Sequence, residues 1–215
     1  MIDFPFNTAV RRKLPKEAFY KHLPLTPKLK SKFVSDVESV FLENSLTMES
    51  LNLGAESEVK EILLLRISLK KPDFDAKIIE EIARQNSHEL IFLLAHEDRR
   101  QLAVYYGKLY RTQWMTEDSV TLTPQGFTLD EVWDSLIEQI ALQEERVTPS
   151  GDTPIGERLA LQDKILKLEQ QIARTEAAAW KERQPKKRFA LYAQLQDYKR
   201  NLETMKHGQT QNADA

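Results

Sequence analysis

The residues that come closest to a catalytic pattern in this chain are carboxylates near a lysine. A metal-dependent nuclease needs carboxylates to hold the metal ion and a lysine nearby to help activate water. Glu58-Val59-Lys60 begins the most apolar stretch of the chain, and Asp36 precedes it. The same acid-x-lysine spacing recurs at residues 75–77 and 197–199, as chance predicts for a chain with 33 acidic residues. We therefore keep a metal-dependent nuclease as the enzymatic alternative and assign no catalytic or metal-binding residue.

The densest basic cluster lies in the C-terminal third and is bordered by aromatic residues. It holds five cations, opposed only by Glu182: Lys181, Arg183, Lys186, Lys187 and Arg188. Such cations bind phosphates or an acidic partner, and the bordering Trp180 and Phe189 can stack on bases. The alternative is that both rings pack within the fold and the charges are solvated. We predict that the five cations, with Trp180, bind nucleic acid or a partner protein. The basic run at residues 11–13, with Lys16 and Lys21, is a second, weaker candidate.

The sequence contains no motif for cysteine chemistry, for a phosphate-binding loop, for a histidine metal site or for a membrane span. The chain has no cysteine, which excludes disulfides, thiolate nucleophiles and cysteine-type zinc sites. Its six glycines form no phosphate-binding loop, and its four histidines have no metal-ligand spacing. The longest apolar run, residues 62–65, is far shorter than the roughly twenty residues that cross a membrane. We expect no cofactor, no membrane contact and a cytoplasmic location.

Charge alternates strongly along the chain although the formal net charge is only −2. Residues 1–32 hold eight Lys/Arg against two acids, whereas residues 116–152 hold nine acids and one Arg. A dedicated non-specific DNA-binding protein carries a clear positive excess, so any nucleic-acid contact here must be local. The charged blocks can also pair with each other, face charged patches on a partner, or be solvated.

The hydrophobic pattern of the first two thirds predicts a sheet with packed helices. Apolar and β-branched runs indicate strands at residues 37–46, 58–70, 88–96, 101–106 and 110–115, with a further one at 119–123. Helices are expected at residues 16–20, after a Thr26-Pro27 cap, after Asp73 or Asp75, and from Thr128. The strand–helix–strand order favours parallel neighbours and the following hairpin adds antiparallel ones. We therefore predict an α+β fold for residues 1–146, a mixed β-sheet with packed helices.

The pattern changes completely after a linker at residues 147–154. Apolar residues then alternate in steps of four and three, a heptad seam that we expect to face another helix: Leu161, Ile165, Leu168, Ile172, Leu191, Leu195, Tyr198 and Leu202. Pro185 interrupts this pattern, which predicts an antiparallel helical hairpin or coiled coil over residues 155–206 and a flexible tail at 207–215. A lone helix of this kind is unstable in water, so its seam must be buried against the second helix, a second copy of the chain or another protein.

Several stretches of this chain, taken in order, resemble one bacterial family. They are Leu14-Pro15-Lys16-Glu17-Ala18-Phe19-Tyr20, the segment 25–39, Leu90-Ile91-Phe92-Leu93-Leu94, Tyr110-Arg111-Thr112-Gln113-Trp114, and Lys181-Glu182-Arg183-Gln184 followed by Leu191-Tyr192. Together they are similar to the family called domain of unknown function 4391, over nearly the whole chain. The resemblance brings no catalytic residues. It implies a gene context near helicases and DNA methyltransferases in restriction-like, anti-phage clusters, and Pro185 departs from the polar, helix-compatible sequence expected there.

These observations lead to one main hypothesis and two alternatives. We expect a non-enzymatic accessory or interaction subunit of a DNA-handling defence complex, with a helicase or DNA methyltransferase component as partner and a basic hairpin tip that contacts nucleic acid or protein. The alternatives are the nuclease and a structural module that forms homo-oligomers through the hairpin. Carboxylates that converge at strand ends would favour the nuclease, and a long apolar stripe left exposed on the hairpin would favour the interaction subunit.

Overall fold

The computed structural model describes residues 2–22, 25–54, 56–142 and 153–210. The chain divides into two units, residues 1–143 and 144–215, called here the sheet domain and the hairpin. The predicted fold class is confirmed, because the first unit contains a mixed sheet with helices and the second contains a pair of helices. The predicted boundary at residue 146 and most of the linker lie outside the described residues.

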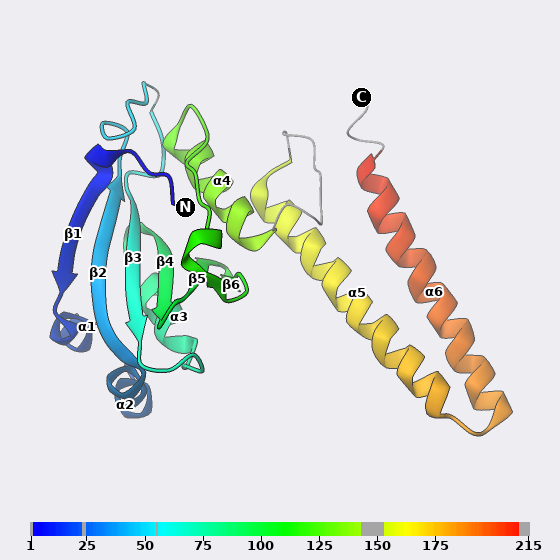
Figure 1. The fold of residues 1–215 in the computed structure, drawn as a ribbon. Coiled ribbons are helices and arrows are strands. Elements are labelled where there is room, and N and C mark those ends of the chain that lie inside the picture. Colours follow the sequence, from blue (N-terminus) through cyan, green and yellow to red (C-terminus); the bar gives the residue numbers. More distant parts are fainter. Residues whose placement is uncertain (1, 23–24, 55, 143–152, 211–215) are drawn as a thin grey trace. The chain divides into compact units, whose positions relative to one another are not determined.

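Seven strands of the sheet domain form a single mixed sheet (Figure 1). Their bounds are β1 (Ala9–Leu14), β2 (Val37–Leu46), β3 (Ile62–Leu69), β4 (Glu89–His96), β5 (Arg99–Tyr106), β6 (Lys108–Arg111) and β7 (Met115–Thr116). The strand order is β1-β2-β3-β4-β5-β6, and β7 also pairs with β5. Only β3 and β4 run parallel, and a helix connects them, which is the predicted strand–helix–strand unit.

Two helices of the sheet domain begin where the sequence supplies a capping hydroxyl, whereas the helix expected after Asp73 or Asp75 begins after Ala76 without a side-chain cap. The helices of this domain are α1 (Lys16–His22), α2 (Pro27–Asp36), α3 (Lys77–Arg84) and α4 (Leu129–Ala141), with short 3-10 turns at Phe6–Thr8 and Glu117–Ser119. The hydroxyl of Thr26 accepts the N–H of Leu29 at 3.3 Å, and the hydroxyl of Thr128 accepts the N–H of Glu131 at 3.1 Å. Each hydroxyl satisfies a backbone donor that lacks a partner within its helix.

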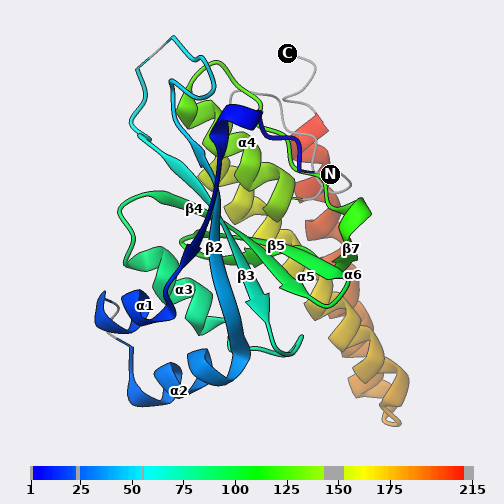
Figure 2. The ribbon, with the colours of Figure 1, turned by 60° about the vertical axis from the view of Figure 1, so that its left-hand side comes forward.

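The main core lies between the sheet and the helices α2 and α3. Residues of α2 and α3 pack there against alternate residues of the strands, among them Leu65 and Ile67 of β3 and Phe92 of β4. The remaining alternate residues point to the opposite face, where Leu64 and Ile91 are also buried. In Figure 2, α3 and α4 lie on opposite sides of the sheet. A sheet covered on both faces explains why β3 and β4 have continuous apolar sequences.

The structure corrects several predicted strands. The strand predicted from residue 58 begins at Ile62, because the carboxylate of Asp130 accepts the N–H groups of Glu58 and Val59. The strand predicted over residues 110–115 is replaced by two short ones, β6 and β7. The strand predicted over residues 119–123 is wrong: a 3-10 turn ends at Ser119, and Leu122 forms only an isolated bridge to Ile2. The edge strand β1 was not predicted.

The hairpin consists of two long helices, α5 (Ile155–Lys181) and α6 (Pro185–Thr210), which lie side by side in Figures 1 and 2. The ion pairs Glu176–Lys199 at 3.6 Å and Glu169–Lys206 at 3.0 Å fix their antiparallel register. Helix α6 continues through residues 207–210, the first part of the predicted tail, and the rest of that tail lies outside the described residues. No helix in the described segments is long and apolar enough to cross a membrane.

Candidate functional site

The candidate site is the hairpin tip, which we define as residues 180–192. Helix α5 ends at Lys181, where the N–H of Glu182 donates to the carbonyl of Ala178 at 3.0 Å. The N–H of Gln184 then donates to the Glu182 carboxylate at 2.8 Å, which closes the turn. Pro185 is the first residue of α6, a position where the missing N–H costs no hydrogen bond. The proline that departs from the family pattern therefore starts the second helix.

Aromatic side chains at the tip are exposed to solvent. Trp180 is 79% exposed, Phe189 77% and Tyr192 41%, and they are the only large hydrophobic residues that the described part of the hairpin exposes. Packing of Trp180 and Phe189 within the fold, which the solvated alternative requires, is not seen. Leaving such rings in water is unfavourable, and exposed apolar surface of this kind is typical of a binding surface.

All five cations of the tip are exposed, and none forms an ion pair with any residue that the structure describes. Lys186, Lys187 and Arg188 occupy the first turn of α6, which contains no acidic residue. The helix dipole places partial positive charge at this end, so these cations add to it instead of opposing it. The resulting local field favours an anion, because a phosphate or carboxylate there relieves the repulsion among the cations.

The predicted seam residues lie on α5 and α6. Three of the eight are buried (Ile165, Leu168 and Leu195) and five are half-buried (Leu161, Ile172, Leu191, Tyr198 and Leu202). Ala179 is completely buried, and its small side chain lets the two helices approach near the tip. The seam therefore presents no fully exposed apolar stripe, and the exposed apolar area of the described hairpin is at its tip.

The acidic residues of the nuclease alternative are not brought together. Asp36 is fully buried and pairs with Lys71 at 2.9 Å, just beyond the C-terminal end of β3. Glu58 is exposed and precedes the N-terminal end of the same strand. An eight-residue strand is about 26 Å long at 3.3 Å per residue, so the two carboxylates cannot share a metal ion. Among the described residues, no three side chains of metal-ligating type form a group that could hold a metal.

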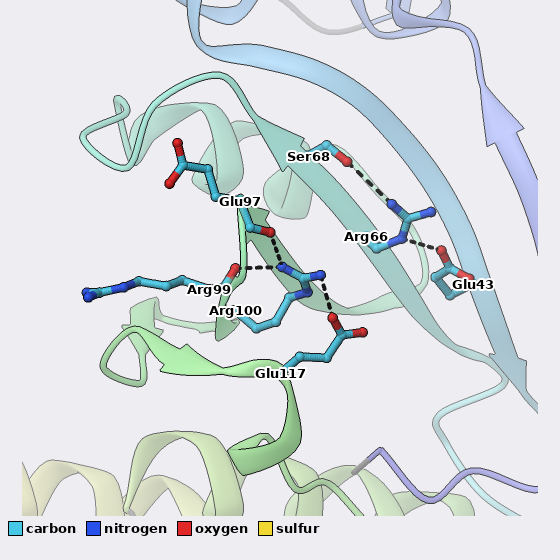
Figure 3. A network of polar contacts seen from close by, with 7 residues as sticks. All are labelled: Glu43, Arg66, Ser68, Glu97, Arg99, Arg100 and Glu117. Atoms are coloured by element: carbon cyan, nitrogen blue, oxygen red, sulfur yellow. Dashed lines mark hydrogen bonds and ion pairs between the residues drawn. The ribbon is translucent and has the colours of Figure 1, made fainter.

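A second set of charged residues gathers on the sheet domain, and sequence reasoning missed it. Arg66 of β3 pairs with Glu43 of β2, and Arg100 of β5 pairs with Glu117 of the second 3-10 turn (Figure 3). These residues are far apart in the sequence and belong to no motif. Only strand order and register bring them to one face, so the sequence carried no local signal for them.

Comparison with known proteins places the chain in a family. It matches the model described as "Domain of unknown function (DUF4391)" over residues 2–202. The chain belongs to this family. No curated protein matches it, and no solved structure matches it either. Because the match covers the sheet domain and most of the hairpin, the exposed tip lies within the segment that defines the DUF4391 family.

Proposed function

We propose that this DUF4391 protein is a non-enzymatic accessory subunit of a DNA-handling complex and that its hairpin tip binds nucleic acid. The observation that supports this most is the exposure of Trp180 and Phe189 beside five cations without an ion-pair partner among the described residues. Cations and exposed rings are the two elements of sequence-tolerant binding to single strands. The cations neutralise the phosphate backbone, and the rings stack on bases.

The tip suits single strands better than duplex. Bases of a duplex are stacked on each other, whereas bases of a single strand are available to an exposed indole or phenyl ring. Apart from its cations and the indole of Trp180, the tip between residues 180 and 192 offers only Glu182, Gln184 and the Tyr192 hydroxyl as polar groups for reading base edges. We therefore expect tighter binding to single-stranded than to double-stranded DNA, with little sequence preference.

The binding experiment compares variants of the whole chain by fluorescence anisotropy with a labelled single-stranded DNA that has a 5′-hydroxyl end. K186A/K187A/R188A removes three phosphate contacts, which should weaken binding and reduce the salt slope by about 2. W180A and F189A should each weaken it roughly 5- to 150-fold, since stacking on one base contributes about 1–3 kcal/mol. The largest loss of affinity in that range is expected if each ring stacks fully on one base in the complex.

The matched control is K164A/K167A/R174A, which removes three exposed cations of α5 outside the tip. It changes the net charge by the same amount, so a difference between the two variants reports where the cations lie and not the total charge of the chain. We expect it to bind DNA like the unmodified chain. If the control and the tip variant lose affinity equally, or if neither loses any, the tip is not the nucleic-acid site.

The partner is the second part of the proposal. We propose a helicase or DNA methyltransferase component of an anti-phage system, on the strength of the gene context that the family resemblance implies. The test is affinity capture of the tagged chain from its native cells after nuclease digestion, which removes partners bridged only by DNA. We expect a helicase or methyltransferase subunit in constant ratio to the bait. Recovery of the chain alone, or only of further copies of itself, would favour the homo-oligomeric module instead.

A further inference from the structure

A cavity of about 490 Å³ lies on the face of the sheet opposite α2 and α3. Its floor includes Leu64, Arg66 and Leu93, and one wall is the N-terminal segment. That segment is held in place because Ile2 bridges to Leu122 and the N–H of Asp3 donates to the Leu122 carbonyl at 2.9 Å. Cavities of about 300–1,000 Å³ suit small molecules, so this one has the size of a ligand site.

Arg100 forms a fixed part of the cavity wall. Its Nη1 donates to the carbonyls of Glu97 and Arg99 at 2.8 and 2.9 Å, and its Nη2 pairs with the Glu117 carboxylate at 2.7 Å (Figure 3). Only 17% of its side chain is exposed, compared with 71% for Glu117. The guanidinium is thus held by two backbone acceptors whatever the position of Glu117, and it contributes positive charge to the cavity.

Arg66 is held from one side and leaves donors free on the other. Its Nε donates to Glu43 at 2.6 Å and its Nη1 approaches the Ser68 hydroxyl at 3.4 Å. Its Cζ lies over the Phe41 ring, 4.3 Å from the ring centre. The structure describes no acceptor for Nη2. A guanidinium that is stacked and held at Nε has little freedom left to lose, so its remaining N–H groups can bind an anion at low entropic cost.

Arg11 supplies the third guanidinium of the cavity, and its backbone has an unusual conformation. Its φ is +50°, the left-handed region that disfavours side chains with a Cβ. The register explains this: Ala9 pairs with Asn44 and Arg12 with Leu42, so β1 has an extra residue. Strand β2 also has one, Glu43, between its pairings with β3. Bulges re-aim side chains beside functional sites, and strained residues persist where they serve one.

We propose that this cavity binds a phosphate monoester attached to a planar, apolar body, the chemistry of a nucleotide. Arg11 and the free Nη2 of Arg66 bind the phosphate, because three guanidinium groups against two carboxylates leave the cavity with a net positive charge. Phe4 and Phe6 line the same cavity, and the 86% exposed ring of Phe6 can stack on the base. This site is independent of the proposed tip function.

Two sources offer this chemistry: a free nucleotide and the 5′-phosphate end of a nucleic-acid strand. Isothermal titration calorimetry of the whole chain with adenosine 5′-monophosphate and with adenosine tests the first. Anisotropy with one DNA strand, carrying either a 5′-phosphate or a 5′-hydroxyl, tests the second. The tip contributes equally to the affinities for the 5′-phosphate and the 5′-hydroxyl strand, so its contribution cancels in their ratio. The tip proposal and the cavity proposal can therefore fail independently of each other.

The decisive variant is R11G, since glycine adopts a φ of +50° without strain and the fold is therefore kept. We expect R11G to bind the phosphorylated ligand at least about tenfold more weakly, the usual effect of one charge-assisted hydrogen bond. R12A, which removes the neighbouring exposed arginine that does not line the cavity, should bind like the unmodified chain. R66K keeps the charge but loses the free Nη2 edge, and it should also bind more weakly.

A preference for adenosine 5′-monophosphate over adenosine, or for the phosphorylated strand end over the hydroxyl end, supports the proposal and identifies the source. The proposal is overturned if neither phosphorylated ligand binds better than its unphosphorylated counterpart. It is equally overturned if R11G and R12A bind alike.

Discussion

Asp36 shows how one buried carboxylate can be structural and not catalytic. Its side chain is completely buried, yet it accepts hydrogen bonds from the Ser35 hydroxyl at 2.6 Å and the backbone N–H of Asp75 at 3.3 Å, and it pairs with Lys71 at 2.9 Å. Burial alone would raise the pKa of Asp36, but these hydrogen bonds and the charge of Lys71 outweigh it and lower the pKa below its ordinary value. The residue ties the end of α2 to the loop after β3.

D36N should therefore destabilise the sheet domain by about 1–3 kcal/mol at neutral pH, since it leaves a buried donor network without its charged acceptor. Because the folded pKa lies below the unfolded value of about 3.9, the carboxylate's contribution is complete above the unfolded pKa and is lost as pH falls through the folded pKa. Urea unfolding from pH 7 to pH 2 measures the difference between D36N and the unmodified chain.

We expect that difference to stay constant above about pH 5 and to shrink at lower pH. The control is D73N, an exposed aspartate in the same loop, which should leave stability within about 0.5 kcal/mol of the unmodified chain. A D36N deficit that is the same at all pH values would mean that Asp36 acts through packing and not through its charge.

At the scale of elements, predictability follows burial. The central strands β3 and β4 were predicted because two covered faces require continuous apolar sequence. The edge strand β1 was missed because four of its six residues are exposed, including Arg11 and Arg12, so its sequence has no apolar alternation. Its pairing depends on β2, which lies more than twenty residues further along the chain. No local pattern can encode a pairing of that kind.

The two candidate sites also differ in how far the sequence alone can predict them. The hairpin tip is contiguous in sequence, so its cations and rings were visible as a cluster around Pro185 before any fold was known. What sequence could not settle was whether Trp180 and Phe189 pack or face water, because that depends on the register of α5 against α6. The cavity of the sheet domain combines residues from the N-terminal segment, five strands and the second 3-10 turn, and only topology assembles it.

At the scale of the whole molecule, net charge limits where nucleic acid can bind. The chain carries a formal charge of −2. Without the five tip cations it would carry −7, so the rest of the chain, taken as a whole, repels a polyanion at long range. If the proposed tip function is right, the phosphate contacts of a strand with a 5′-hydroxyl end are confined to those five side chains. The number of tip cations then sets an upper limit on how steeply the affinity depends on salt concentration.

We expect a plot of log affinity against log salt concentration, measured on a single strand with a 5′-hydroxyl end, to have a slope no steeper than about −3.5. Each phosphate contact contributes roughly −0.7 on single strands, and five contacts are available. R12A/K13A, which removes two exposed cations of β1, should leave this slope unchanged. A steeper slope that R12A/K13A reduces would instead assign part of the binding to the basic run at residues 11–13, and the sheet domain would then share the nucleic-acid surface with the hairpin.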